Sequence, residues 1–249
     1  MLATAAMRRA CTRTLCASPR VMRPTSQPTL SFDPSAKTAM DKQEPPAPGA
    51  DFRVVIVGAG NINFGSDEGP WNHSFRLEHK LGPRLKVVAL IDPDAERARR
   101  VLKTKCQSFV LSAYKDTVVY PTFKDYMASV CAETYPHAVW VGSPPAFRGG
   151  TEPGRNLEQL LTAGLPNVPL FIEKPVSTGA VDQTFEVAKM LEQNGSLVSV
   201  GYMLRYLKVV QKMKQIIAEN DLHVMAVNAR YIICLLYTSP SPRDGLLSR

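Results

Sequence analysis

Short runs of Val and Ile alternate with helical patterns from Arg53 onward, and this alternation constrains the fold more than any other feature of the sequence. Such runs, separated by helices, are typical of a parallel sheet that helices cover on both sides. The expected strands are 53–57, 86–91, 138–142, 170–172 and 197–201, and the expected helices are 72–81, 94–105, 156–163, 180–193 and 207–219. The sequence therefore predicts an α/β fold with a doubly wound parallel sheet.

A glycine-rich turn, GAGNINFG, follows the first expected strand. Gly58 permits a sharp turn, and Gly60 lets backbone N–H groups approach a pyrophosphate at a helix N-terminus. The third glycine of this fingerprint is replaced by Asn63. The match is therefore partial, but its place after the first strand favours a dinucleotide-binding domain of the Rossmann type over residues 51–222.

Asp92 closes the second expected strand and indicates which dinucleotide is bound. A carboxylate there can accept both ribose hydroxyls of NAD and repels a 2′-phosphate. A turn-forming Asp-Pro pair is the alternative interpretation. We therefore expect NAD as the cofactor. NADP remains an alternative, and Arg97 is then the residue to hold the additional phosphate.

A lysine at the end of an expected strand is the candidate catalytic residue. Lys174 lies in the string Phe-Ile-Glu-Lys-Pro, directly after strand 170–172. A lysine at the carboxyl end of a parallel strand points into the crevice where such sheets bind ligands. Its ammonium can bind a substrate hydroxyl and stabilise the alkoxide-like oxygen that forms as hydride leaves carbon. Glu173 can orient Lys174, and Pro175 fixes the local turn.

The sequence motifs, in chain order, are Gly58-x-Gly60, Gly142-Ser143-Pro144-Pro145, Phe171-Ile172-Glu173-Lys174-Pro175 and Val200-Gly201-Tyr202-Met203-Leu204-Arg205-Tyr206. In this order they resemble the Gfo/Idh/MocA oxidoreductase family, which includes glucose-fructose oxidoreductase and inositol dehydrogenase. The resemblance covers residues 53–233, which correspond to the family's nucleotide-binding domain and the first strand of its second domain. It implies hydride transfer between a nicotinamide cofactor and a hydroxyl or carbonyl carbon of a sugar, polyol or cyclic alcohol.

The resemblance also implies a role for each matching residue. By this resemblance, the pyrophosphate is contacted by Gly58, Gly60, Asn61 and Ile62, and the ribose is contacted by Asp92. Ser143 and Pro144 would form the nicotinamide side. Lys174 would contact both the nicotinamide ribose and the substrate. Arg205 lies near the domain junction, on the substrate side. The alternative for Arg205 is an ordinary arginine at a helix start.

The sequence departs from the family in two places. Many relatives carry a histidine shortly after the Ser-Pro motif, where this chain has Phe147-Arg148. The family's general base, an Asp/His cluster in the second domain, would lie beyond Ile233, so residues 223–233 are expected to begin a truncated substrate domain. This chain therefore lacks the general base and the domain that determines the specific substrate. This chain alone is expected to be inactive. A homo-oligomer would form through the missing domain.

The two ends of the chain do not resemble folded sequence. Residues 1–32 contain five arginines and no acid, which is typical of an organelle transit peptide, or they are untranslated leader with the true start at Met40. Residues 41–50 form a Pro-rich linker. At the other end, 234–249 resembles the translation of a sequencing-library adapter, with a genuine flexible tail as the alternative. The protein is expected to be cytoplasmic, or mitochondrial or plastid if residues 1–39 are a transit peptide.

Charge and composition exclude other classes of protein. The net charge of +8 comes mostly from the two ends, and the middle, 51–233, carries only +3, so we expect no nucleic-acid partner. No stretch approaches the ~20 apolar residues of a membrane span, so no membrane partner is expected. The four histidines and five cysteines show no metal-ligand spacing, so no metal is expected.

Two other functions are alternatives to a dehydrogenase of this family. A short-chain dehydrogenase needs Tyr-x-x-x-Lys, which Tyr120–Lys124 matches, but the glycine turn is of the wrong type. A non-catalytic protein that senses a dinucleotide on the same fold remains the alternative, because fold does not determine function. Lys174 favours the enzyme.

Overall fold

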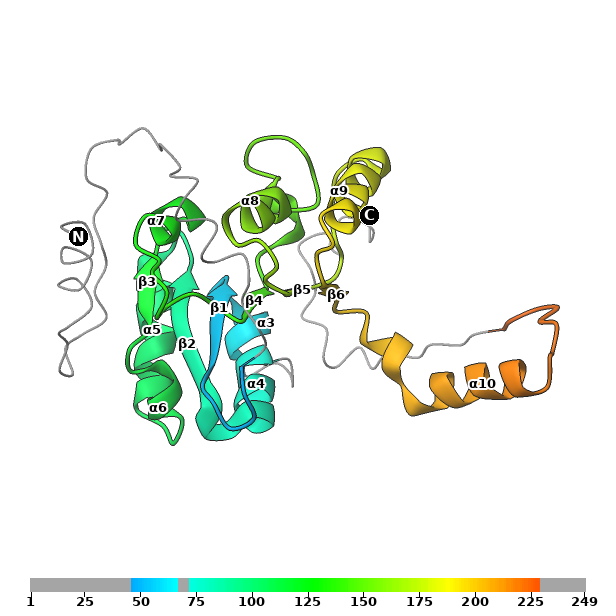
Figure 1. Ribbon diagram of the computed structural model, residues 1–249, viewed down its shortest axis with the longest axis horizontal. Coiled ribbons are helices and arrows are strands. Elements are labelled where there is room, and N and C mark those ends of the chain that lie inside the picture. The colour runs from blue at the N-terminus through cyan, green and yellow to red at the C-terminus, as the bar shows by residue number, and fades with distance from the viewer. Residues whose placement is uncertain (1–45, 67–71, 229–249) are drawn as a thin grey trace, which may run out of the picture.

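The computed structural model describes residues 46–66 and 72–228 of the chain (Figure 1). Within these ranges, six strands form one parallel sheet in the order β3-β2-β1-β4-β5-β6. The strands are β1 (Phe52–Val57), β2 (Leu85–Ile91), β3 (Val118–Tyr120), β4 (Ala138–Val141), β5 (Leu170–Ile172) and β6 (Val198–Val200). The predicted doubly wound Rossmann sheet is confirmed, and its strand order reverses between β1 and β4, where such folds bind ligands.

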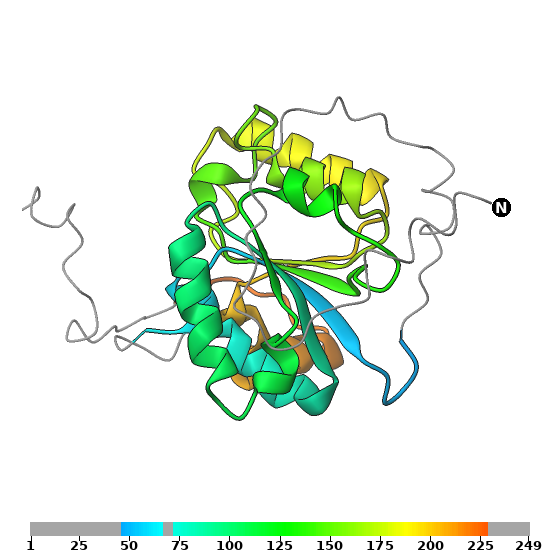
Figure 2. The same ribbon diagram turned by 90° about the vertical axis from the view of Figure 1, so that its left-hand side faces the viewer.

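Helices cover both faces of the sheet, as Figure 2 shows. In chain order they are α3 (Asn61–Phe64), α4 (His73–Leu81), η1 (Gly82–Arg84), α5 (Ala95–Cys106), α6 (Leu111–Tyr114), α7 (Phe123–Met127), η2 (Pro145–Phe147), α8 (Leu157–Gly164), α9 (Val181–Gln193), η3 (Met203–Tyr206) and α10 (Lys208–Glu219). One core lies between the sheet and α4, α5 and α6, and the other lies between the sheet and α7, α8 and α9.

Strand β1 supplies both cores because successive side chains of a strand point to opposite faces. Val54 and Ile56 pack with Leu77 of α4 and Leu102 of α5, and all four are nearly inaccessible to solvent. The alternate residues Val55 and Val57 pack with Leu161 of α8 and Val187 of α9. A continuous run of β-branched residues is therefore required here, since neither face of β1 is in contact with water.

The structure contains short elements that sequence periodicity did not predict. Strand β3 has three residues and pairs with β2 at the edge of the sheet. Helix α7 begins at Thr122, whose side chain accepts a hydrogen bond from the backbone N–H of Asp125. Helices α3 and α6 span four residues each. These elements of three to five residues complete too few periods for periodicity alone to identify them.

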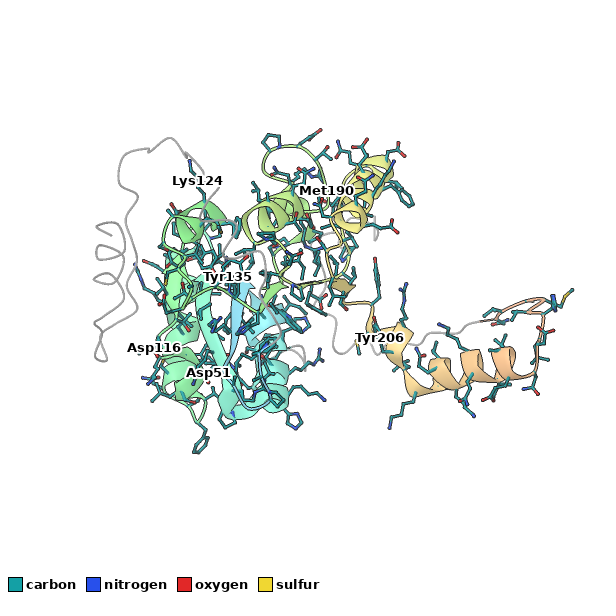
Figure 3. All side chains as sticks on the ribbon, viewed as in Figure 1. Asp51, Asp116, Lys124, Tyr135, Met190 and Tyr206 are labelled. Atoms are coloured by element: carbon teal, nitrogen blue, oxygen red, sulfur yellow. The ribbon has the colours of Figure 1, made fainter. Side chains whose placement is uncertain are left out.

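Helix α10 lies apart from the sheet (Figure 1), and none of its residues is buried. Figure 3 shows Tyr206 where this arm leaves the body that contains Met190 of α9. Residues 223–228 are exposed and form no strand, contrary to the prediction of a half-buried strand over 223–233. In the described part of the chain they are paired with no other strand, and an isolated strand leaves its backbone N–H and C=O groups without partners.

Several predictions fall outside the described residues. They are the leader over residues 1–39, most of the linker, the end of the strand predicted to reach Ile233, and the adapter-derived segment 234–249. Among the helices of the described ranges, none has the length and apolar composition that a bilayer span requires.

Candidate functional site

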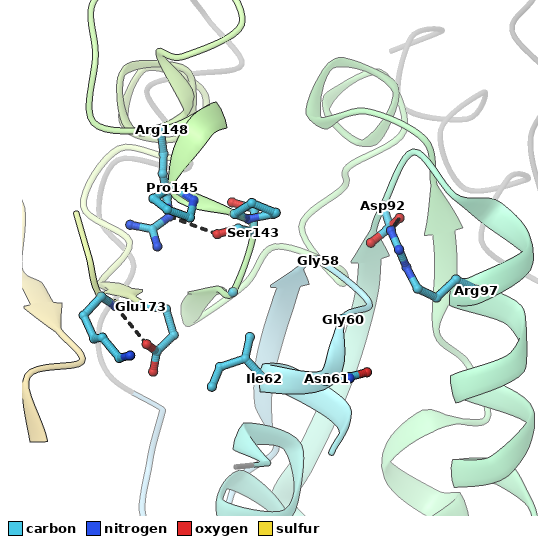
Figure 4. Close-up of a pocket in the computed structure, with 13 residues that line it drawn as sticks. Gly58, Gly60, Asn61, Ile62, Asp92, Arg97, Ser143, Pro145, Arg148 and Glu173 are labelled. Carbon is cyan, nitrogen blue, oxygen red and sulfur yellow. Dashed lines mark hydrogen bonds and ion pairs between the residues drawn. The ribbon is translucent and has the colours of Figure 1, made fainter. Parts of the chain in front are cut away.

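A cavity of 390 Å³ opens at the carboxyl ends of β1, β2, β4 and β5. Its lining residues are Gly58, Gly60, Asn61, Ile62, Asp92, Arg97, Gly142, Ser143, Pro144, Pro145, Arg148, Glu173 and Lys174. Figure 4 shows Asp92 and Arg97 at one end, Arg148 and Glu173 at the other, and the glycine turn between them. Of the predicted site residues, Pro175 and Arg205 do not line the cavity.

The glycine turn is built so that the chain can pass close to β4. Gly58 has φ +96°, a conformation that side chains rarely adopt, and its N–H donates to the carbonyl of Ile91 at 2.8 Å. A Cβ at Gly58 would lie 3.0 Å from the backbone nitrogen of Ser143. The turn after β1 is therefore in direct contact with the loop after β4.

Asn63, which replaces the third glycine of the fingerprint, is completely buried. Its amide nitrogen donates to the carbonyl oxygens of Val57 at 3.1 Å and Gly58 at 2.7 Å. The space for this side chain comes from Gly142, where a Cβ would come too close to the Asn63 amide for both to fit. The departure from the fingerprint is thus compensated within the structure, and the glycine that permits close packing is Gly142, directly after the neighbouring strand β4.

The carboxylate of Asp92 is held almost entirely by protein donors. Its Oδ2 accepts from the backbone N–H of Ala59 at 2.6 Å, and its Oδ1 accepts from the N–H of Asp94 and from Nη2 of Arg97, each at 2.8 Å. A carboxylate has about four acceptor positions, so three of them are occupied. Asp92 is buried, whereas Arg97 is partly exposed. A ligand would therefore reach the Asp92 carboxylate mainly by displacing the Arg97 side chain.

His73 fixes Glu173 at the opposite end of the cavity. Its Nε2 lies 2.7 Å from Oε1 of Glu173, and the other carboxylate oxygen accepts from the backbone N–H of Lys174 at 2.9 Å. Burial alone would raise the pKa of Glu173, but the His73 hydrogen bond, the charges of His73 and Lys174 and the Lys174 N–H outweigh it and lower that pKa. The lowered pKa favours an ionised Glu173 carboxylate beside Lys174.

The side chain of Lys174 is exposed and lines the cavity. Its ammonium forms no hydrogen bond or ion pair within the described part of the chain, whereas Asp92 and Glu173 are both engaged. Its peptide bond to Pro175 is cis. Arg205 lies in η3, near the start of the α10 arm. Of the cations that line the cavity in the described ranges, Lys174 is therefore one whose charged group has no protein partner.

Arg148 is a site residue that sequence reasoning did not identify as functional. It is 1% exposed, lines the cavity, and donates to the carbonyls of Ser143 and Val176. Arginine is almost never fully buried without partners. The burial of the Arg-Gly-Gly segment after the Ser-Pro motif is therefore what marks Arg148 as a site residue, and the sequence alone does not show that burial. Among the described residues, no group of His, Cys, Asp or Glu could hold a metal ion.

The fold and the cavity define a dinucleotide-binding oxidoreductase domain, and comparison with known proteins agrees. Residues 52–202 match the Gfo/Idh/MocA oxidoreductase family model, described as an NAD-binding Rossmann fold. The chain therefore belongs to the Gfo/Idh/MocA oxidoreductase family. Residues 205–241 match a second model, described as an oxidoreductase C-terminal domain, and this match begins where the α10 arm begins.

Two curated relatives, both uncharacterized proteins of Schizosaccharomyces pombe, are similar to this chain. One is 43% identical over 74% of this chain and 48% of its own length, and the other is 42% identical over 79% of this chain and 49% of its own length. The chain thus spans about half the length of the curated relatives it matches.

Among solved structures, the chain is similar in fold to the WlbA dehydrogenase of Chromobacterium violaceum, solved with NADH and UDP-GlcNAcA. The TM-score is 0.50 at 17% identity, over 72% of this chain and 43% of the other. At this identity the similarity concerns the fold alone.

Proposed function

We propose that this chain is the cofactor-binding part of an NAD(P)-dependent oxidoreductase that acts on a hydroxyl or carbonyl carbon of a sugar, polyol or cyclic alcohol. The observation that carries the proposal is the convergence of the glycine turn, Asp92 and Lys174 on one cavity at the switch in strand order. A fold relative solved with NADH and a nucleotide sugar supports the same class of ligand.

The residues of the cavity fit a dinucleotide from one end to the other. The glycine turn would hold the pyrophosphate through the backbone N–H groups of Gly60, Asn61 and Ile62, which begin α3. A Cβ at Gly60 would meet no atom within 4 Å, so this position leaves space in which a ligand can lie. Asp92 would bind the adenosine ribose, which favours NAD over NADP. When bound, the nicotinamide ring donates or accepts the hydride.

Lys174 is the residue that we propose for the chemical step. Its exposed ammonium would donate a hydrogen bond to the substrate oxygen and stabilise the negative charge that develops there as hydride leaves the carbon. Glu173, fixed by His73, would hold the Lys174 backbone in place at the end of β5. The general base and the walls that select the substrate would come from the further length present in the relatives.

The experiment uses a longer form of the protein that includes the C-terminal domain, assayed against a panel of polyols and sugars. We expect nicotinamide reduction with at least one of them, and no turnover by the 249-residue chain alone. Lys174→Ala should lower kcat by about 100-fold or more, with little change in NADH affinity. Lys115→Ala, at an exposed lysine before β3, is the control and should be active.

Two results would contradict this proposal. Turnover that survives Lys174→Ala would make the lysine structural. NADH binding without turnover on any substrate would favour the alternative, a non-catalytic protein that senses a dinucleotide.

A further inference from the structure

Arg148 joins the two loops that form the far end of the cavity. Its Nε donates to the carbonyl oxygen of Ser143 at 3.0 Å, and its Nη1 donates to the carbonyl oxygen of Val176 at 2.9 Å. The first carbonyl belongs to the loop after β4 and the second to the loop after β5. Figure 4 shows the Arg148 guanidinium between Ser143 and Glu173. One side chain therefore links both loops.

Burying the Arg148 guanidinium costs free energy, because the charge loses its contact with water, so its position requires an explanation. Burial lowers the pKa of Arg148, and the nearby carboxylates of Glu158 and Glu173 oppose that shift. Glu158 is itself buried, and its Oε2 accepts from the backbone N–H of Gly149 at 2.8 Å. A buried cation with a buried anion close to it is at best weakly stabilising compared with apolar residues, which suggests a role other than stability.

Gly149, the residue after Arg148, is held by helix α9 and by the loop after Lys174. Thr184 of α9 donates to the carbonyl of Gly149 at 3.2 Å, and Gly149 has φ +69°. A Cβ at Gly149 would lie 2.5 Å from Cβ of Ser177 and 2.7 Å from the carbonyl oxygen of Val176. The loop after Lys174 therefore packs directly on the backbone beside Arg148.

We propose that Arg148 is a positioning residue that sets the separation of the Ser143 loop and the Lys174 loop, and so shapes the half of the cavity that receives the nicotinamide end of the cofactor. This inference rests on the proposed function. A planar guanidinium presents donors in a fixed arrangement and can hold two carbonyl oxygens at a set distance, which neither a lysine nor an apolar side chain can do.

The proposal predicts a selective effect on ligands, because Arg148 is distant from the Asp92 end of the cavity (Figure 4). ADP carries the adenosine and pyrophosphate but no nicotinamide, so its binding depends on the glycine turn and Asp92. Arg148→Met keeps much of the stem and removes both hydrogen bonds. We expect the Kd for NADH to rise by about tenfold and the Kd for ADP to change by less than about twofold.

The measurement is a titration of NADH, followed by fluorescence, and of ADP, followed by calorimetry, on the 249-residue chain. Arg84→Met is the matched control, since Arg84 directly precedes β2, at the end of the strands opposite the cavity, and donates to the carbonyl of Ala50. Arg148→Lys, which keeps a cation beside Glu158 and can reach one carbonyl, should show a smaller rise in the NADH Kd. It also provides the comparison if the methionine variant does not fold.

Equal losses for NADH and ADP, or no loss for either, would overturn the inference while leaving the proposed function in place. Failure of the unsubstituted chain to bind NADH would instead contradict the proposed function itself, and the inference with it.

Discussion

The Nε2 atom of His73 lies 2.7 Å from Oε1 of Glu173, and this contact joins the helix after the glycine turn to the strand end that carries Lys174. Both side chains are buried. The His73 ring also packs against the rings of Trp140 and Phe171, with centroids 5.5 and 5.0 Å away. This buried pair therefore ties helix α4 to the end of β5 beside Lys174.

Replacing His73 by phenylalanine should destabilise the fold. The substitution keeps a ring against Trp140 but leaves the buried Glu173 carboxylate without that donor, which costs ~1–3 kcal/mol. Urea unfolding of the 249-residue chain measures the change. His79→Phe, at an exposed position of the same helix, is the control, and equal stabilities of the two variants would show that the His73–Glu173 contact contributes nothing.

The stability that Glu173 contributes should depend on pH on the acid side. Its pKa is lowered from the ordinary 4.5, because the His73 hydrogen bond and nearby positive charges outweigh burial. An acid with a lowered pKa stabilises the fold above its unfolded pKa and loses that contribution as pH falls through the folded value. The free-energy difference between the unsubstituted chain and Glu173→Gln should be largest above pH 4.5 and shrink below it. A difference independent of pH would contradict this account.

Much of the site could be predicted because it depends on local sequence and topology. Gly58, Asp92 and Lys174 each follow a recognisable strand, and the carboxyl ends of parallel strands meet at one edge of the sheet. Arg148 could not be predicted in this way. Its role depends on the carbonyls of two loops that are distant in sequence, and no periodicity reports such contacts.

The same distinction applies to Asn63 and Gly142. The sequence shows an incomplete fingerprint at Asn63, whereas the structure shows that the glycine required for close packing is Gly142, directly after β4. The strand expected over 223–233 is wrong for residues 223–228, because alternation alone does not supply a neighbouring strand.

Gly142→Ala should therefore damage the site through Asn63. The new Cβ would collide with a buried amide that is bonded to Val57 and Gly58, so we expect a loss of ~1–3 kcal/mol in unfolding free energy and weaker NADH binding. Combining it with Asn63→Gly removes the collision and should recover part of both losses. If Gly142→Ala alone is as stable as the unsubstituted chain, the close packing described here is not maintained in solution.

Arg97→Met should increase the preference for NAD over NADP. Arg97 neutralises Asp92 through the 2.8 Å contact, and without it the carboxylate would repel a 2′-phosphate more strongly. We expect the ratio of NADPH to NADH dissociation constants to rise by about tenfold, measured on the same preparation. An unchanged or lower ratio would contradict this account and indicate that Asp92 does not face the ribose.

The central claim is that the cavity binds a nicotinamide dinucleotide across the glycine turn, and a titration of NADH into the 249-residue chain and its Gly60→Ala variant tests it most directly. A methyl group at Gly60 meets no protein atom within 4 Å, so the variant should unfold at the same temperature as the unsubstituted chain. The account predicts saturable enhancement of NADH fluorescence with the unsubstituted chain and clearly weaker binding by the variant. Absence of saturable binding, or equal affinity of the two proteins, would contradict it.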